Sequence, residues 1–196
     1  MSKSTIVWLL VTLGLSAPAV GGNGPIELSS EDYAVYAAVL RWPPFIRDRS
    51  ALIIFARTAV HDPSFCDPNP QITRSAPYQT AMADYVKKCG TSAPLQARFG
   101  STLREQLLSY EDREAIFHGP HGTNAGWDRF RTKWPGARGF FELSRVGFSP
   151  DGKRAFVLVT EYCGVTCGRA TYFPVENDGT TWHLGTGILA GQPRLE

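Results

Sequence analysis

The stretch AFVLVTEYCGVTCGRATYFPV, residues 155–175, contains the strongest structural signal of this chain. Two cysteines separated by three residues, Cys163 and Cys167, stand between runs rich in β-branched and aromatic residues, which are typical of strands. If the cysteines face each other across the turn, each opposite pair is chemically compatible: Glu161 with Arg169, Val159 with Thr171, and Val157 with Phe173. The stretch therefore predicts a β-hairpin closed by a disulfide.

Two further turn sequences flank this hairpin. Residues 149–153 and 177–180 each contain Asp-Gly between apolar, strand-like runs, which is a strong hairpin signal. A two-residue turn at the second site would extend one apolar face through two more pairs: Val175 with Trp182, and Phe173 with Leu184. From Phe140 onward the sequence predicts an antiparallel meander of about four strands.

The chain before residue 140 has mainly helical periodicity. A helix is expected from the Ser-Ser-Glu-Asp cap at residues 29–32 to the break at Pro43-Pro44. Further helical patterns are found in residues 78–90, in the stripe Leu95, Phe99, Leu103 and Leu107, in residues 111–117, and around Trp127, Phe130 and Trp134. The run Leu52-Ile53-Ile54-Phe55 is too short for a helix and predicts a strand. The expected fold class is α+β, with N-terminal helices packed on one face of the C-terminal antiparallel meander.

The N-terminus has the three parts of a secretory signal peptide. Lys3 precedes an apolar stretch from Thr5 to Leu15, and Ala17-Pro18-Ala19 supplies a small-x-small cleavage site. The apolar run is shorter than the roughly 20 residues that span a bilayer, so a cleaved signal is favoured over a transmembrane anchor. We expect a signal peptide at 1–19, a flexible leader at 20–30 and a single domain at 31–196, exported to a periplasm or out of the cell.

Charge and cysteine content restrict the classes of partner and compartment. The formal net charge is only +2, which argues against nucleic acid as a partner. Four cysteines in an exported chain suggest two disulfides, and among the three possible pairings we favour Cys66 with Cys89 and Cys163 with Cys167. A four-cysteine zinc site is disfavoured because the first pair is too widely spaced. A redox role for the second pair is disfavoured because the thioredoxin-type motif has two intervening residues and opens a helix.

A set of short motifs in the second half of the chain occurs in a characteristic order: Gly126-Trp127-x-x-Phe130, Trp134-Pro135, Ser144-Arg145-Val146-Gly147-Phe148, Asp151-Gly152, Cys163-Gly164-x-x-Cys167-Gly168, Tyr172 and Gly179-x-x-Trp182. The combination resembles a group of uncharacterised exported bacterial proteins with an SRVGF strand followed by a CGxxCG hairpin. The resemblance covers roughly the C-terminal third and implies a fold and export, not an activity. Members usually have a glycine shortly before the hairpin tyrosine, where this chain has Arg169 and Ala170.

Histidines and a serine offer weak candidates for chemistry. His118 and His121 could approach one metal ion, but the sequence identifies no third ligand, so a solvated loop is favoured. Acid-base chemistry could use His61-Asp62 or His183 with Glu161, with Ser144 as a nucleophile. Ser144 has no activating motif around it, and Glu161 already has a cross-strand partner in Arg169.

The remaining candidates concern binding. Arg145 is a charge within an apolar strand, so it is expected to form a buried ion pair or, as the alternative, to face a ligand. Tyr162, Tyr172 and Phe156 should lie on the opposite face from Val157, where exposed aromatic side chains would offer a partner site. The leading hypothesis is a non-enzymatic envelope or secreted interaction module that needs no cofactor and binds a protein or envelope component. The alternative is a metal-assisted or acid-base hydrolase of the cell envelope.

Overall fold

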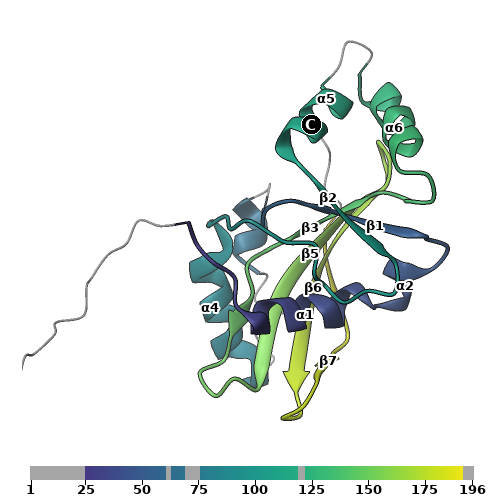
Figure 1. Cartoon of the computed structure of the whole chain (residues 1–196). Helices are drawn as coiled ribbons and strands as arrows, with labels where there is room; N and C mark the ends of the chain where they lie inside the picture. The colour runs from purple at the N-terminus through teal and green to yellow at the C-terminus, as the bar shows by residue number, and fades with distance from the viewer. Residues whose placement is uncertain (1–24, 61–62, 69–75, 119–121, 192–196) are drawn as a thin grey trace, which may run out of the picture.

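The computed structural model describes residues 25–60, 63–68, 76–118 and 122–191 (Figure 1). The helices are α1 (Ser30–Leu40), α2 (Pro43–Ile46), α4 (Gln79–Cys89), α5 (Tyr110–Phe117) and α6 (Gly122–Lys133), with 3-10 turns η1 (Pro63–Cys66) and η2 (Ala76–Tyr78). The strands are β1 (Ala51–Phe55), β2 (Arg104–Leu108), β3 (Phe140–Leu143), β4 (Gly147–Phe148), β5 (Arg154–Tyr162), β6 (Gly168–Asn177), β7 (Trp182–Leu184) and β8 (Ile188–Gly191). The predicted signal peptide at 1–19 and residues 20–24 of the leader lie outside the described residues. Within the described residues, no helix is long and apolar enough to cross a membrane.

All eight strands form one mixed sheet, with the order β2-β1-β3-β5-β6-β7, β4 on β5 and β8 on β6. Strand β1 pairs in parallel with both β2 and β3, and the other pairs are antiparallel. Helices α5 and α6 occupy the connection from β2 to β3 and lie at one end of the sheet (Figure 1). The predicted α+β fold with a four-stranded antiparallel meander is therefore wrong, because the chain is a mixed α/β protein whose parallel pairs lie at the β2 edge of the sheet.

Both faces of the sheet are covered, which explains why the expected one-sided arrangement fails. On β1, Leu52 and Ile54 join a core cluster with α1 and α2, whereas Ile53 and Phe55 join a second cluster with α5 and α6. A third cluster places α4 on the β5–β6 part of that second face. A strand buried on both faces is apolar at every position, as the run Leu52-Ile53-Ile54-Phe55 is.

Several local predictions are confirmed. Ser29 caps α1 in a capping box with Asp32, and α4 ends at Gly90. Strands β5 and β6 pair in the predicted register, with Glu161 opposite Arg169, Val159 opposite Thr171 and Val157 opposite Phe173. Local capping chemistry and facing pairs thus predicted the geometry correctly where neighbouring residues determine it.

Two other local predictions are wrong. The apolar stripe from Leu95 to Leu107 is not a helix, because residues up to Leu103 are irregular, Gly100 has φ +65° and β2 begins at Arg104. The β6–β7 register differs by two residues: Val175 lies opposite Leu184, and Asn177 lies opposite Trp182. The loop at 178–181 is longer than a two-residue turn because Asp178 Oδ1 accepts bonds from the backbone of Thr180 and Thr181.

Two glycines of the sequence motifs occupy close approaches between elements. A Cβ added to Gly147 would lie 2.2 Å from the carbonyl oxygen of Ala81 on α4, and one added to Gly126 would lie 2.9 Å from the carbonyl oxygen of Ile116 on α5. Only the last two residues of the SRVGF motif lie in a strand, since β4 contains just Gly147 and Phe148. These glycines allow the helices to approach their neighbours.

Candidate functional site

Both predicted disulfides are present. Cys66 pairs with Cys89, and Cys163 pairs with Cys167, with Cα–Cα distances of 5.5 and 5.0 Å. The first joins η1 to the end of α4, and the second closes the β5–β6 hairpin. They therefore secure the helix on one face of the sheet and the tip of its longest hairpin.

The predicted aromatic binding face is not exposed. Tyr162, Tyr172 and Phe156 lie on the opposite face from Val157, but only 1–2% of each residue is accessible. Helix α4 covers Phe156 and Tyr172, while Tyr162 packs with the α5–α6 cluster. The expectation of an open aromatic surface is wrong because helices from the first half of the chain cover this face as well.

Arg145 is partly exposed, and its Nη1 donates to Thr91 Oγ1 at 3.4 Å. No carboxylate of the described residues forms the predicted ion pair with it, and its Nε is buried without a described partner. The SRVGF arginine therefore lies beside the end of α4 and contacts a hydroxyl group.

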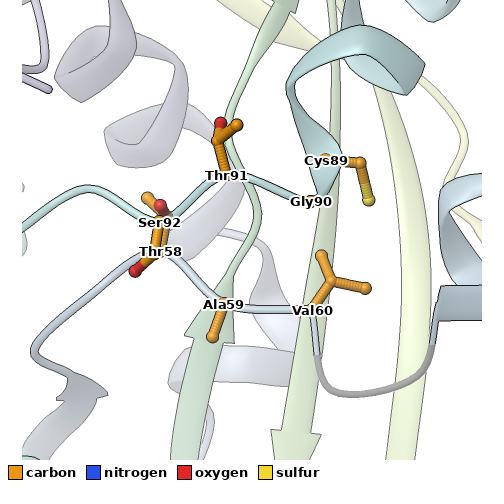
Figure 2. Close-up of a pocket in the computed structure, with 7 residues that line it drawn as sticks. All are labelled: Thr58, Ala59, Val60, Cys89, Gly90, Thr91 and Ser92. Carbon is orange, nitrogen blue, oxygen red and sulfur yellow. The ribbon is translucent and has the colours of Figure 1, made fainter.

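Next to Arg145 lies a cavity of about 240 Å³ between the segments 58–60 and 89–92 (Figure 2). Figure 2 shows the two segments passing each other, with the side chains of Cys89 and Val60 on the same side of the opening. We call it the hydroxyl pocket, because its polar side chains are Thr58, Thr91 and Ser92. Each of these hydroxyls already has a protein partner: Thr58 Oγ1 accepts from Ala93 N, Thr91 Oγ1 donates to Lys88 O, and Ser92 Oγ accepts from Arg57 Nε. The protein itself therefore already engages every hydroxyl group of the pocket.

Among the described residues, the candidates for metal and acid-base chemistry are not brought together. The described residues contain no group of three or more His, Cys, Asp or Glu side chains that could hold a metal ion. His118 pairs with Glu114 one turn earlier on α5, His183 pairs with Asp178, and Ser144 Oγ donates to the carbonyl of Arg145. His121 and His61-Asp62 lie outside the described residues.

A strongly charged cavity lies at the disulfide-closed tip of the β5–β6 hairpin and measures about 440 Å³. Four arginines line it together with one carboxylate, and we call it the arginine pocket: Arg47, Arg49, Arg138, Arg169 and Glu161. Pro44, Gly168 and both cysteines of the Cys163–Cys167 disulfide complete the wall. The four arginines come from three segments that are distant in the sequence, and only the Arg169–Glu161 pair was predicted.

Glu161 holds the inner part of the arginine pocket. Only 7% of the residue is accessible, and its two oxygens accept hydrogen bonds from Arg49 and Arg169, the latter at 3.0 Å. The Arg49 guanidinium also lies over the ring of Phe141, and that of Arg169 lies over the ring of Trp42. Ion pairing and cation–π contacts together fix two of the four guanidinium groups.

Arg49 is buried, and its partners among the described residues satisfy only part of its guanidinium group. Its side chain is 2% accessible, and its Nε and Nη1 have no hydrogen-bond partner among the described residues. Burial lowers the pKa of Arg49, and the charge and hydrogen bond of Glu161 oppose this effect. A buried guanidinium with unused donors is a source of positive potential behind the pocket wall.

The outer part of the arginine pocket is formed by Arg47 and Arg138, which are both exposed. Arg47 follows α2, and the chain then turns through Asp48, whose φ of 57° reverses its direction. Arg138 Nη1 lies 3.7 Å from Asp48 Oδ2, a solvent-exposed pair that contributes little. Gly139 lies so close to the hairpin that an added Cβ would be 1.9 Å from the carbonyl oxygen of Tyr162, so this glycine places Arg138 at the pocket.

No protein-family model matches this chain, and neither the curated proteins nor the solved structures contain a significant match. The residues of the site themselves therefore indicate its chemistry. Arginine forks bind carboxylate, sulfate and phosphate oxygens through paired hydrogen bonds. Among the described residues the arginine pocket combines this chemistry with a cavity large enough for an organic ligand.

Proposed function

We propose that this chain is an exported binding module that holds an anionic group of its ligand in the arginine pocket. The observation that carries the proposal is the charge of the lining, in which four guanidinium groups accompany one buried carboxylate. This keeps the hypothesis of a non-enzymatic interaction module and moves its recognition site from the aromatic face to the tip of the β5–β6 hairpin. The partner is a protein or envelope component that carries the anionic group.

Export to a periplasm or to the cell exterior is the second part of the proposal. It is supported by the predicted signal peptide at 1–19 and by the two disulfides, which persist in oxidising compartments. Cell fractionation with mass spectrometry of the N-terminus should recover a chain that begins after Ala19 outside the cytoplasm. A full-length chain with free thiols in the cytoplasm would contradict it.

Anion binding is tested by calorimetric titration of the purified, oxidised protein with benzoate, phenyl sulfate and phenyl phosphate, with benzyl alcohol as the neutral control. We expect anions to bind, the neutral alcohol not to bind, and affinity to fall as salt increases. The double variant Arg47→Gln/Arg138→Gln should bind at least about tenfold more weakly, because hydrogen bonds to charged groups contribute about 1.5–3 kcal/mol each.

The matched control is Arg57→Gln, which removes an exposed arginine that lies outside the arginine pocket and bonds Ser92. This variant should bind the anions as the unmodified protein does. The proposal fails if no anion binds, or if the Arg47→Gln/Arg138→Gln variant remains folded by circular dichroism and binds with unchanged affinity.

A further inference from the structure

The charge balance of the arginine pocket points to a ligand group with more than one negative charge. Four arginines and one glutamate give the lining a formal excess of three positive charges, because Arg49 and Arg169 share the single carboxylate of Glu161. Asp48 is the other acidic group near the pocket, but its pair with Arg138 is long and largely exposed, with side chains 74% and 60% accessible. A single carboxylate ligand would therefore neutralise only part of the excess charge.

The positions of the donors favour a group with several oxygens. The exposed Arg47 and Arg138 and the partly exposed Arg169 approach the cavity from three different segments of the chain. A phosphate monoester presents three strong acceptor oxygens and carries about −1.5 to −2 charges at pH 7. Arg49 adds potential from behind the wall, where the low dielectric strengthens it.

Resting on the proposed function, we infer that the arginine pocket selects the dianionic form of a phosphate monoester. The charged groups that face the pocket are the guanidinium groups of Arg47, Arg49, Arg138 and Arg169 and the carboxylates of Glu161 and Asp48. No histidine is among its lining residues. Arginine keeps its proton throughout the physiological range, so the change in binding between about pH 5 and 7.5 comes from the ligand, whose second ionisation lies near pH 6.

The test compares two probes of the same size, phenyl phosphate and phenyl sulfate, by calorimetry at about pH 5 and about pH 7.5 and at constant ionic strength. Phenyl phosphate is mostly a monoanion at the lower pH and mostly a dianion at the higher, whereas phenyl sulfate is a monoanion at both. We expect the affinity for phenyl phosphate to rise roughly tenfold with pH, following the dianion fraction. The affinity for phenyl sulfate should stay constant and be the weaker of the two at the higher pH.

Each outcome separates this inference from the proposed function. Equal binding of both probes at the higher pH, or phosphate binding that does not change with pH, overturns selection of the dianion and leaves the anion site intact. Absence of binding by either probe overturns both. The variant Arg47→Gln/Arg138→Gln should lose the pH dependence together with the affinity, and Arg57→Gln should keep both.

A further arm distinguishes soluble phosphate monoesters from lipid headgroups. Vesicles of phosphatidylcholine with phosphatidic acid display a phosphate monoester, and vesicles with phosphatidylglycerol display a singly charged diester. Co-sedimentation with phosphatidic acid vesicles alone, in addition to phenyl phosphate binding, assigns the site to a membrane-displayed monoester. Binding of phenyl phosphate without co-sedimentation assigns it to a soluble one. Stronger sedimentation with phosphatidylglycerol than with phosphatidic acid contradicts selection of the dianion.

Discussion

The arginine pocket and the hydroxyl pocket each lie beside a disulfide, but their arginines are placed differently relative to the cavity. In the hydroxyl pocket, Arg57 and Arg145 are outside the lining and donate to the hydroxyl groups of Ser92 and Thr91. In the arginine pocket, the arginines line the cavity and exceed the carboxylates that accompany them. An excess of buried or converging donors, rather than the presence of a cavity, therefore distinguishes the candidate recognition site.

The largest effect should come from removing the carboxylate that holds the arginine pocket together. Glu161→Ala leaves Arg49 as a buried charge without its partner, and breaking such a buried pair costs about 3–5 kcal/mol. Urea denaturation measures this loss, and Arg57→Ala at the hydroxyl pocket should change stability by less than about 0.5 kcal/mol. If the two variants were equally stable, the inner ion pair would not distinguish the two pockets.

The two disulfides should differ in how much they stabilise the fold. In the chain-entropy model the Cys66–Cys89 disulfide contributes about 3.4 kcal/mol to the free energy of unfolding and the Cys163–Cys167 disulfide about 2 kcal/mol. The difference arises because the first pair is separated by 23 positions in the sequence and the second by only 4. Replacing each pair by serines should therefore lower the free energy of unfolding in that order. A greater loss from the hairpin pair would show that its disulfide does more than restrict the unfolded chain.

Two glycines, one beside each pocket, provide the third test. Gly139→Ala would place a Cβ 1.9 Å from the carbonyl oxygen of Tyr162, so we expect a loss of about 1–3 kcal/mol. Gly90→Ala should be tolerated, since no atom lies within 4 Å of its added Cβ and its φ is −77°. Thermal unfolding of both variants measures the difference, and similar melting temperatures would contradict the close approach at the arginine pocket.

The smallest effect concerns α4, the helix that ends at the hydroxyl pocket. Burial raises the pKa of Asp84, but hydrogen bonds from Lys88 and from the backbone of Phe148 outweigh it, so the pKa is lowered overall. Because the pKa of Asp84 is lower in the folded state, its carboxylate stabilises the fold at pH values above the unfolded-state pKa. This stabilisation is lost as the pH falls through the folded-state pKa. Asp84→Asn should therefore lower the free energy of unfolding by less than about 1 kcal/mol at neutral pH. Below about pH 4, the free energy of unfolding of this variant should fall less steeply with decreasing pH than that of the unmodified protein. If urea denaturation at several acidic pH values gave the same pH dependence for both proteins, Asp84 would not stabilise the fold in this way.

The sequence was sufficient where the structure depends on near neighbours. The capping box at Ser29, the end of α4 at Gly90 and the facing pairs of the Cys163–Cys167 hairpin follow from local hydrogen bonding and from the two-residue period of strands. The uninterrupted apolar run at Leu52-Ile53-Ile54-Phe55 also contained the signal of a strand buried on both faces. The C-terminal hairpins give a stronger local pattern than this short run, and that pattern favours an antiparallel sheet.

Tertiary structure alone decided the sheet order and the site. The parallel pairing of β1 with β2 and β3 joins segments separated by long connections, and no local pattern specifies which strands become neighbours. The same packing covered Tyr162, Tyr172 and Phe156 with helices and gathered Arg47, Arg49 and Arg138 around the tip of the hairpin. Guanidinium groups from distant segments form a site only when the sheet brings those segments together, so this chain's sequence by itself determined its turns, caps and cysteine pairs, and its fold determined where the charge gathers.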